Sequence, residues 1–181
     1  MRDGENGEGG YENTGKEAES KETENEVRGE DRLAVSKIRC GTVIDHINAG
    51  KALLVLRILG IKPGSSERVL IAMNVPSKKM GKKDIVKVEG KYIGEEELNR
   101  IALISPNATI NLIEDYRVSE KRRVELPSIV EGILTCPNRN CITNSREPIR
   151  SRFHIVKEGE DVKAICHYCG RVIRELDRYV V

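Results

Sequence analysis

Aromatic side chains are scarce in this sequence, which has no Trp, one Phe and five Tyr among 181 residues. A hydrophobic core built from this chain must therefore rest on Ile, Val and Leu. Long apolar runs are missing too, and none approaches the roughly 20 residues that a helix needs to cross a bilayer. We therefore expect no membrane-spanning segment.

The sequence patterns of common catalytic sites are also missing. There is no G-x-x-x-x-G-K-[ST], no G-x-G-x-x-G after a strand, no H-E-x-x-H and no G-x-S-x-G. No nucleophile stands beside a candidate general base. We therefore expect a protein that is not itself an enzyme.

Charge is distributed unevenly along the chain. Residues 1–31 contain 11 Asp and Glu against four Lys and Arg, a balance of −7, so the remainder of a chain with net charge +2 carries +9. This segment has almost no apolar side chains with which to offset the entropy of ordering, so we predict a disordered acidic tail over 1–31. It resembles neither a mitochondrial presequence nor a secretory signal, and we expect a cytoplasmic, reducing location.

Four cysteines in the last third of the chain form two close pairs. Cys136 and Cys141 have the spacing C-x4-C, and Cys166 and Cys169 have the spacing C-x2-C followed by Gly170. Two short loops of this kind bring four thiolates to the corners of a tetrahedron, which is the arrangement of a structural Zn2+ site. Because four thiolates leave no open position for water or substrate, we predict one zinc ion with a structural role.

Other interpretations of these cysteines are weaker. A redox C-x-x-C motif needs a helix after it to lower the thiol pKa, whereas apolar runs typical of strands flank this one. Two disulfides do not suit a reducing compartment. His154 and His167 are possible competing ligands, but His167 should point away from a metal held by the cysteines on either side of it. Cys40 is expected to be a buried or half-buried thiol in a strand.

Hydrophobic periodicity between the tail and the cysteines predicts six elements in the order β-α-β-β-α-β. We expect an α+β, ferredoxin-like sandwich over residues 32–126, in which one antiparallel sheet carries two helices on one face. A small all-β zinc-binding domain is expected over 127–181. The predicted strands are 37–47 (broken near Gly41), 68–75, 84–89 and 109–118, and the predicted helices are 50–60 and 95–104.

Basic residues gather near several of these predicted strands. They could form a solvated face, or they could bind an anionic ligand such as a polyphosphate through charge-assisted hydrogen bonds. Composition alone does not separate a nucleotide from RNA. The polar set consists of Asp45, His46, Lys78, Lys79, Lys82, Lys83, Lys87 and 121–123.

The segments 39–47, 74–77, 80–84 and 105–111, together with the cysteine module, closely resemble the regulatory chain of aspartate carbamoyltransferase. The resemblance covers about residues 33–176, in the order and nearly the spacing of that family. Two features depart from it: the acidic tail, and Cys40, which stands where a basic residue is common.

This resemblance implies a non-catalytic allosteric subunit of pyrimidine biosynthesis. Its N-terminal domain would bind ATP, CTP and UTP, and its zinc domain would dock onto the catalytic chain. Homodimers of regulatory chains would join two catalytic trimers, giving a dodecamer with three regulatory dimers. By the same resemblance, Lys121 and His46 would face the phosphates, with Asp45 beside them, and Lys87 would lie near the base or ribose. The implied nucleotide site comprises Ile38, Asp45, His46, Lys87, Asn111, Tyr116, Val118 and Lys121.

A zinc-ribbon protein that binds nucleic acid is the alternative. The charge of +9 beyond the tail and the arginines around the cysteines favour it. The shortage of aromatic side chains for base stacking argues against it, because Phe153 is the sole Phe. We therefore expect no nucleic-acid partner.

Overall fold

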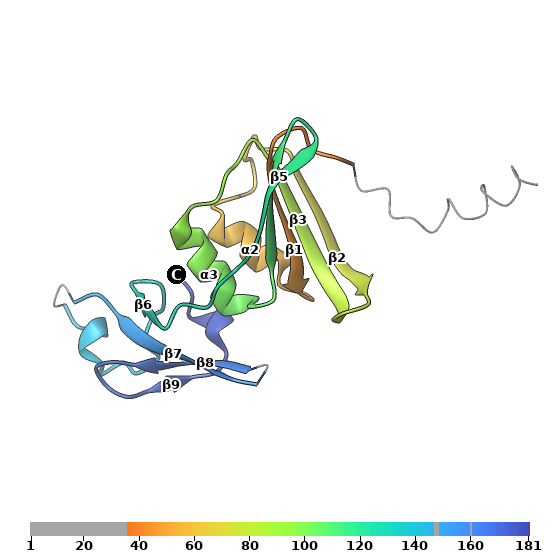
Figure 1. Ribbon diagram of the computed structural model, residues 1–181. Coiled ribbons are helices and arrows are strands. Elements are labelled where there is room, and N and C mark those ends of the chain that lie inside the picture. Colours follow the sequence, from red (N-terminus) through yellow and green to blue (C-terminus); the bar gives the residue numbers. More distant parts are fainter. Residues whose placement is uncertain (1–35, 147–148, 160) are drawn as a thin grey trace, which may run out of the picture. The chain divides into compact units, whose positions relative to one another are not determined.

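Five antiparallel strands form the first sheet of the structure, a computed structural model that describes residues 36–146, 149–159 and 161–181. The central strand is β1, and the order across the sheet is β2-β3-β1-β4-β5 (Figure 1). The predicted acidic tail lies outside the described residues. The strands are β1 Gly41–Asn48, β2 Val69–Ser77, β3 Gly81–Glu89, β4 Thr109–Glu114 and β5 Arg117–Arg123.

Two helices, α2 (Ala52–Ile58) and α3 (Glu95–Ile104), cover one face of this sheet (Figure 1). The sheet presents Ile44, Val86 and other aliphatic side chains to them, and no aromatic ring among the described residues takes part in this core. Alternate residues of a strand point to opposite faces, so the other face of β1 and β3 carries Val43 and Ile85 together with polar side chains such as Lys87. The expected reliance on aliphatic residues is confirmed for this sheet. No helix in the described part of the chain is long and apolar enough to cross a membrane.

The single strand predicted over 109–118 was wrong. The chain turns back at Asp115 and Tyr116, which have φ angles of 46° and 63°, and continues as the separate edge strand β5. Two-residue turns of this kind usually contain Asn-Gly or Asp-Gly, and Tyr follows Asp115 here, so the local sequence indicated this turn only weakly. The turn gives the sheet a fifth strand, on which Lys121 lies.

Gly41 begins β1 at a point where two main chains come unusually close. Its φ is +124°, and a Cβ atom on this residue would lie 2.2 Å from the carbonyl oxygen of Val88. Only glycine fits such a contact. The break that the sequence predicted near Gly41 is therefore the true start of the strand.

A four-stranded antiparallel sheet with the order β6-β7-β8-β9 follows. Its core contains Phe153, which is fully buried, together with Leu134, Leu176 and three of the cysteines. Leu103 of α3 packs into the same cluster. The elements are β6 Ile129–Glu131, η1 Ile142–Asn144, β7 Arg152–Glu158, β8 Asp161–Cys166, β9 Val172–Ile173 and η2 Leu176–Arg178.

The carboxylate of Asp84 is completely buried in the first sheet. One oxygen accepts the backbone N–H of Ala52 at 3.0 Å, and the other accepts that of Asn74 at 2.8 Å. The first bond satisfies an N–H group of α2 that has no partner within the helix. The second holds Asn74, whose φ of 57° accompanies an irregularity in the pairing of β2 with β3. A single side chain thus fixes both the start of α2 and the course of β2.

An ion pair joins Lys51, just before α2, to Asp177 of η2. The hydrogen bond from Lys51 is the main cause of a lowered pKa for Asp177, and burial opposes it. About a third of each side chain is exposed. The pair therefore contributes the modest stabilisation of a screened ion pair.

Replacing Asp84 by Asn should destabilise the protein by about 1.5–3 kcal/mol, because the amide has one acceptor oxygen and turns an N–H donor toward the second backbone N–H. Urea unfolding should show a lower midpoint at an unchanged slope. Asp115→Asn, at an exposed turn, is the matched control and should change stability by less than about 0.5 kcal/mol. Equal stability of the two variants would contradict this role for Asp84.

Replacing Asp177 by Asn should cost about 0.2–1 kcal/mol at neutral pH. Because the pKa of Asp177 is lowered in the folded state, the stabilisation is present above its ordinary value of 3.8 and is lost as the pH falls through the lowered value. The difference in unfolding free energy between wild type and variant should therefore shrink in acid. A difference that grows on acidification would refute the ion-pair assignment.

Candidate functional site

The four predicted metal ligands come together in the structure. Cys136 and Cys141 lie in the loop between β6 and β7, Cys166 ends β8, and Cys169 follows in the turn before β9. Their sulfur atoms all lie within 4.8 Å of one another. The fold thus joins two loops that are far apart in sequence.

The spacing of the sulfur atoms fits a tetrahedral metal ion. Cys136 Sγ lies 3.6 Å from Cys169 Sγ, and Cys141 Sγ lies 3.8 Å from Cys166 Sγ. A tetrahedron with metal–sulfur bonds of about 2.3 Å has sulfur–sulfur edges of about 3.8 Å. These two edges match that value, and the remaining sulfur–sulfur distances are no longer than 4.8 Å, so the donor set can gather around one ion.

Hydrogen bonds to sulfur surround the centre. The hydroxyl of Thr143 donates to Cys141 Sγ at 3.2 Å. Burial raises the pKa of Cys136 and of Cys166, although backbone N–H groups donate to both sulfur atoms. Burial also raises the pKa of Cys169, but the backbone N–H of Arg171 and neighbouring side chains outweigh it and lower the value to about 6. The thiolate form of Cys169 is thus favoured even without a metal. A bound cation would compensate the negative charge of the other three thiolates.

The other interpretations of the cysteines receive no support. Cys136 Sγ is 3.6 Å from Cys169 Sγ and Cys141 Sγ is 3.8 Å from Cys166 Sγ, both too far for a disulfide bond, and strand β9, not a helix, follows Cys169. Neither His154 nor His167 belongs to the four-sulfur group. Cys40 is half-buried, as expected, but lies in a bend before β1 and not in a strand.

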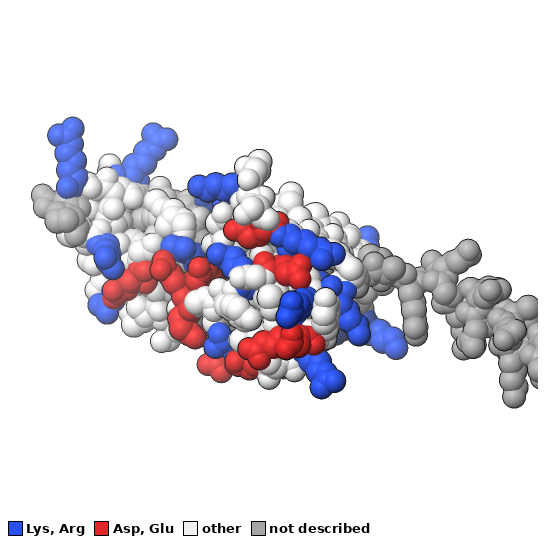
Figure 2. Space-filling model, turned by 90° about the horizontal axis from the view of Figure 1, so that it is seen from above, with Lys and Arg blue, Asp and Glu red and all other residues white. Residues whose placement is uncertain are grey.

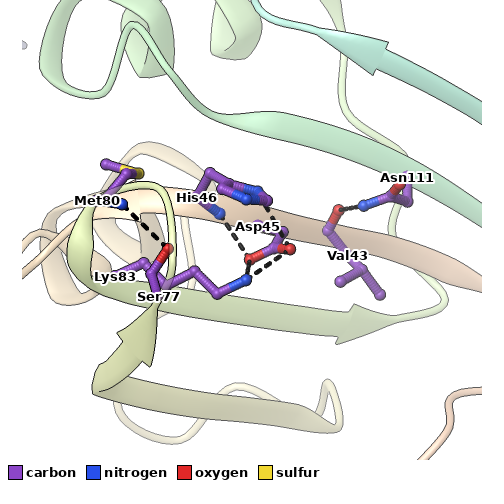
Figure 3. Close-up of polar contacts among 7 residues, drawn as sticks. All are labelled: Val43, Asp45, His46, Ser77, Met80, Lys83 and Asn111. Carbon is purple, nitrogen blue, oxygen red and sulfur yellow. Dashed lines mark hydrogen bonds and ion pairs between the residues drawn. The ribbon is translucent and has the colours of Figure 1, made fainter.

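A second polar site surrounds an irregularity in β1. His46 has a φ of 57°, and the pairing of β1 with β3 shifts register between Ile44 and Ile47. Asp45 accepts the backbone N–H of His46 at 2.7 Å (Figure 3). Lys83 reaches the same carboxylate from β3, with its Nζ 2.7 Å from Oδ1 and 3.0 Å from Oδ2. The imidazole Nδ1 lies 3.2 Å from Asp45 Oδ2.

Lys87, Val43, Asn111 and Lys121 form a row across four neighbouring strands. Val43 is in register with Lys87 on β3 and with Asn111 on β4, and Asn111 is in register with Lys121 on β5. The amide of Asn111 donates to the carbonyl oxygen of Val43 at 3.4 Å (Figure 3). Burial lowers the pKa of Lys87, and the charge of Asp45 partly opposes this shift. Three predicted site residues thus lie side by side on one sheet.

Beside this row lies a cavity of about 320 Å³ that is strongly basic. No Asp or Glu is among the described residues that line it. His46 and Lys121, which the sequence analysis assigned to the phosphates, both border the cavity. Its lining consists of His46, Lys79, Thr109, Lys121, Arg122 and Arg123.

The remaining predicted residues lie toward the other end of β1. Ile38 is buried, whereas Tyr116 and Val118 are exposed on the β4–β5 hairpin. A hydrogen bond of 2.9 Å from the backbone N–H of Tyr116 to the carbonyl oxygen of Arg39 holds the hairpin near Ile38. None of these three residues borders the basic cavity.

Sequence reasoning left several residues out of the predicted site. Lys83, Lys79, Arg122 and Arg123 had been noted as basic residues but were not assigned to it. The alternation of Lys83 and Lys87 along one strand would have placed both on one face. Thr109 carried no signal, because its role depends on the strand pairing.

Comparisons with known proteins identify the family of the chain. Residues 33–125 match the family model described as "Aspartate carbamoyltransferase regulatory chain, allosteric domain". Residues 128–178 match that described as "Aspartate carbamoyltransferase regulatory chain, metal binding domain". The chain belongs to the family of aspartate carbamoyltransferase regulatory chains.

Similar regulatory chains occur in several archaea. That of Archaeoglobus fulgidus is 64% identical over 149 residues, covering 82% of this chain and 97% of its own length. That of Pyrococcus abyssi is 56% identical over 144 residues, covering 79% and 93%. That of Haloquadratum walsbyi is 54% identical over 144 residues, covering 80% and 79%. Regulatory chains are the non-catalytic subunits of the enzyme, so the expectation that this chain is not itself an enzyme is confirmed.

Removing the bound metal of this regulatory chain, or one of its cysteine ligands, should unfold the second sheet. A core this small depends on its cross-link, so chelation or Cys169→Ser should expose the backbone amides of β7 and β8 to hydrogen exchange. The amides of β1 and β3 should stay protected. Cys40→Ser is the control and should change neither group; unaltered protection of β7 and β8 after chelation would contradict a structural metal.

Proposed function

We propose that this chain is an allosteric subunit that binds nucleoside triphosphates on the first sheet, beside the irregularity of β1. The observation that carries the proposal is the basic cavity formed by His46, Lys79, Lys121, Arg122 and Arg123. A triphosphate brings several negative charges, and ammonium and guanidinium groups bind phosphate through charge-assisted hydrogen bonds. The family to which the chain belongs supports the same interpretation.

The base and ribose would lie along the row that leads away from the cavity. Asn111 offers an amide that both donates and accepts, and Lys87 is partly buried beside it. Tyr116, Val118 and Ile38 would border the far end of the nucleotide. Asp45 would act mainly by holding His46 and Lys83 in place, because its carboxylate contacts both.

The proposed effectors are ATP, CTP and UTP. Each would shift the complex between quaternary states by binding one state more tightly than the other. Because all three share the triphosphate, the cavity would supply common affinity. The row of residues across the sheet would distinguish the bases.

The second sheet would be a separate zinc-binding domain. We propose boundaries of 32–126 for a nucleotide-binding domain of ferredoxin-like fold and 127–181 for the zinc domain. One Zn2+ would be held by Cys136, Cys141, Cys166 and Cys169, since thiolates at this spacing suit zinc and leave no open position. The ion would stabilise the domain and take no part in catalysis.

The proposed partners are the catalytic chain, which the zinc domain would contact, and a second regulatory chain. The names of the similar proteins support the first partner. The edge strand β2 exposes Ile71 and Met73, an apolar surface of the kind that a homodimer covers. Three such dimers would join two catalytic trimers into a dodecamer. A cytoplasmic location suits this assembly.

Nucleic-acid binding is the less favoured alternative. Acidic and basic side chains are interspersed on the face drawn in Figure 2, and among the residues described there no continuous basic stripe crosses it. The sole Phe, Phe153, is completely buried and offers no ring for stacking. If nucleic acid remained bound to the complex after purification, this alternative would be favoured.

Lys121→Ala should weaken the binding of both ATP and CTP by about 10- to 150-fold, because it removes one charge-assisted hydrogen bond worth roughly 1.5–3 kcal/mol to phosphates that both nucleotides share. Isothermal titration of the regulatory chain measures this directly. Lys157→Ala, on the second sheet, is the matched control and should bind both nucleotides normally. Unchanged affinity in Lys121→Ala would show that this lysine does not bind the phosphates and is an ordinary solvated surface residue.

Asn111→Ala and Tyr116→Ala should alter ATP and CTP binding unequally, because these residues would face the base and sugar. Neither these two variants nor Lys121→Ala should affect the activity of isolated catalytic trimers, which lack this chain.

The decisive functional test is aspartate carbamoylation by the reconstituted complex, with and without each nucleotide. A rate that no nucleotide changes would overturn the proposed allosteric role.

A further inference from the structure

Two of the three histidines in the chain face each other on the surface of the second sheet. His154 Nε2 and His167 Nδ1 are 3.1 Å apart, and both side chains are exposed. Neither belongs to the four-sulfur group. The proposed nucleotide site does not use this pair either.

The backbone under both histidines is firmly held. His154 lies in β7, in register with Ile165 of β8. The backbone N–H of His167 donates to the carbonyl oxygen of Arg152 at 2.9 Å, and the backbone N–H of Gly170 donates to the carbonyl oxygen of Cys166 at 3.0 Å, which closes the turn that contains His167. The ring of Tyr168 stands edge-on to that of His167, with centroids 5.1 Å apart. The nitrogens are therefore brought together by the fold and not by chance motion of long side chains.

We propose that His154 and His167 form a second metal site, which binds a divalent late first-row transition ion such as Zn2+, Ni2+ or Cu2+. With metal–nitrogen bonds of about 2.05 Å, a nitrogen separation of 3.1 Å gives an angle of about 98° at the ion. This lies between the 90° of square or octahedral coordination and the 109° of a tetrahedron. The two nitrogens face each other along the line between the ring centroids, which are 5.3 Å apart, so each exposed ring would have to turn toward the shared ion.

Neutral imidazole is the commonest protein ligand for these metals. The exposure of both rings leaves the other coordination positions to water, so the site would take up and release its ion readily. The bound ion would link β7 to the loop between Cys166 and Cys169. In its absence the two rings share one N–H···N hydrogen bond.

The test is the metal content of the full-length chain, already carrying the ion of its four cysteines, after equilibrium dialysis against micromolar free Zn2+. Wild type should hold two ions per chain by elemental analysis. His154→Ala and His167→Ala should each hold one. His46→Ala removes the remaining histidine and should still hold two.

Retention of the first ion shows that each variant keeps a folded cysteine centre. A wild type that stays at one ion would overturn the proposal and leave a simple hydrogen bond between the rings. Two ions in His154→Ala or His167→Ala would overturn it as well, because the extra ion would then bind elsewhere. NMR of the imidazole nitrogens gives an independent readout: signals of both His154 and His167 should shift with the second equivalent of Zn2+, and those of His46 should not.

Discussion

Two backbone N–H groups from different segments meet the fully buried carboxylate of Asp84, and the arrangement of the first sheet depends on this contact. It fixes the start of α2 above the sheet and the bend of β2 beside it. On the neighbouring residue, Lys83 leaves β3 toward the opposite face and pairs with Asp45. Of two adjacent residues in β3, Asp84 thus stabilises the core and Lys83 belongs to the proposed effector site. A change in the backbone of β3 would therefore alter both the core and that site.

The second sheet has a smaller apolar core than the first. It has a single buried aromatic ring and a few aliphatic side chains, too little apolar surface for a sheet of this length to be secure by packing alone. Three of the four cysteines lie inside that core and are part of it, so metal binding and apolar packing would be one event. The same centre holds the loop on which His167 sits. The proposed histidine site would therefore depend on the cysteine site for its geometry, whereas the cysteine site would not depend on the histidines.

Most features that depend on residues close together in the sequence could be predicted, and features that depend on residues far apart in the sequence could not. The cysteine ligands could be predicted because the spacing within each pair is local and the chemistry of four thiols is restrictive. The helices 95–104 and 50–60 could be predicted from apolar periodicity, to within a few residues of α3 and α2. The turn at Asp115 and Tyr116 could not, because Asp tolerates a left-handed backbone but Tyr does not favour it, and no Gly follows Asp115. The ion pair of Lys83 with Asp45 and the facing of His154 and His167 join residues 38 and 13 positions apart, and only the strand register brings them together.

The close approach of β1 and β3 at Gly41 has a consequence for the evolution of this chain. A methyl group there would lie inside the van der Waals radius of a main-chain oxygen that cannot rotate away, and the φ angle excludes other residues independently. In a saturation library, this position should therefore return glycine alone. The neighbouring Cys40 is half-buried and does not have a positive φ angle, so other side chains fit its backbone conformation. Two adjacent codons would thus evolve at very different rates for purely steric reasons.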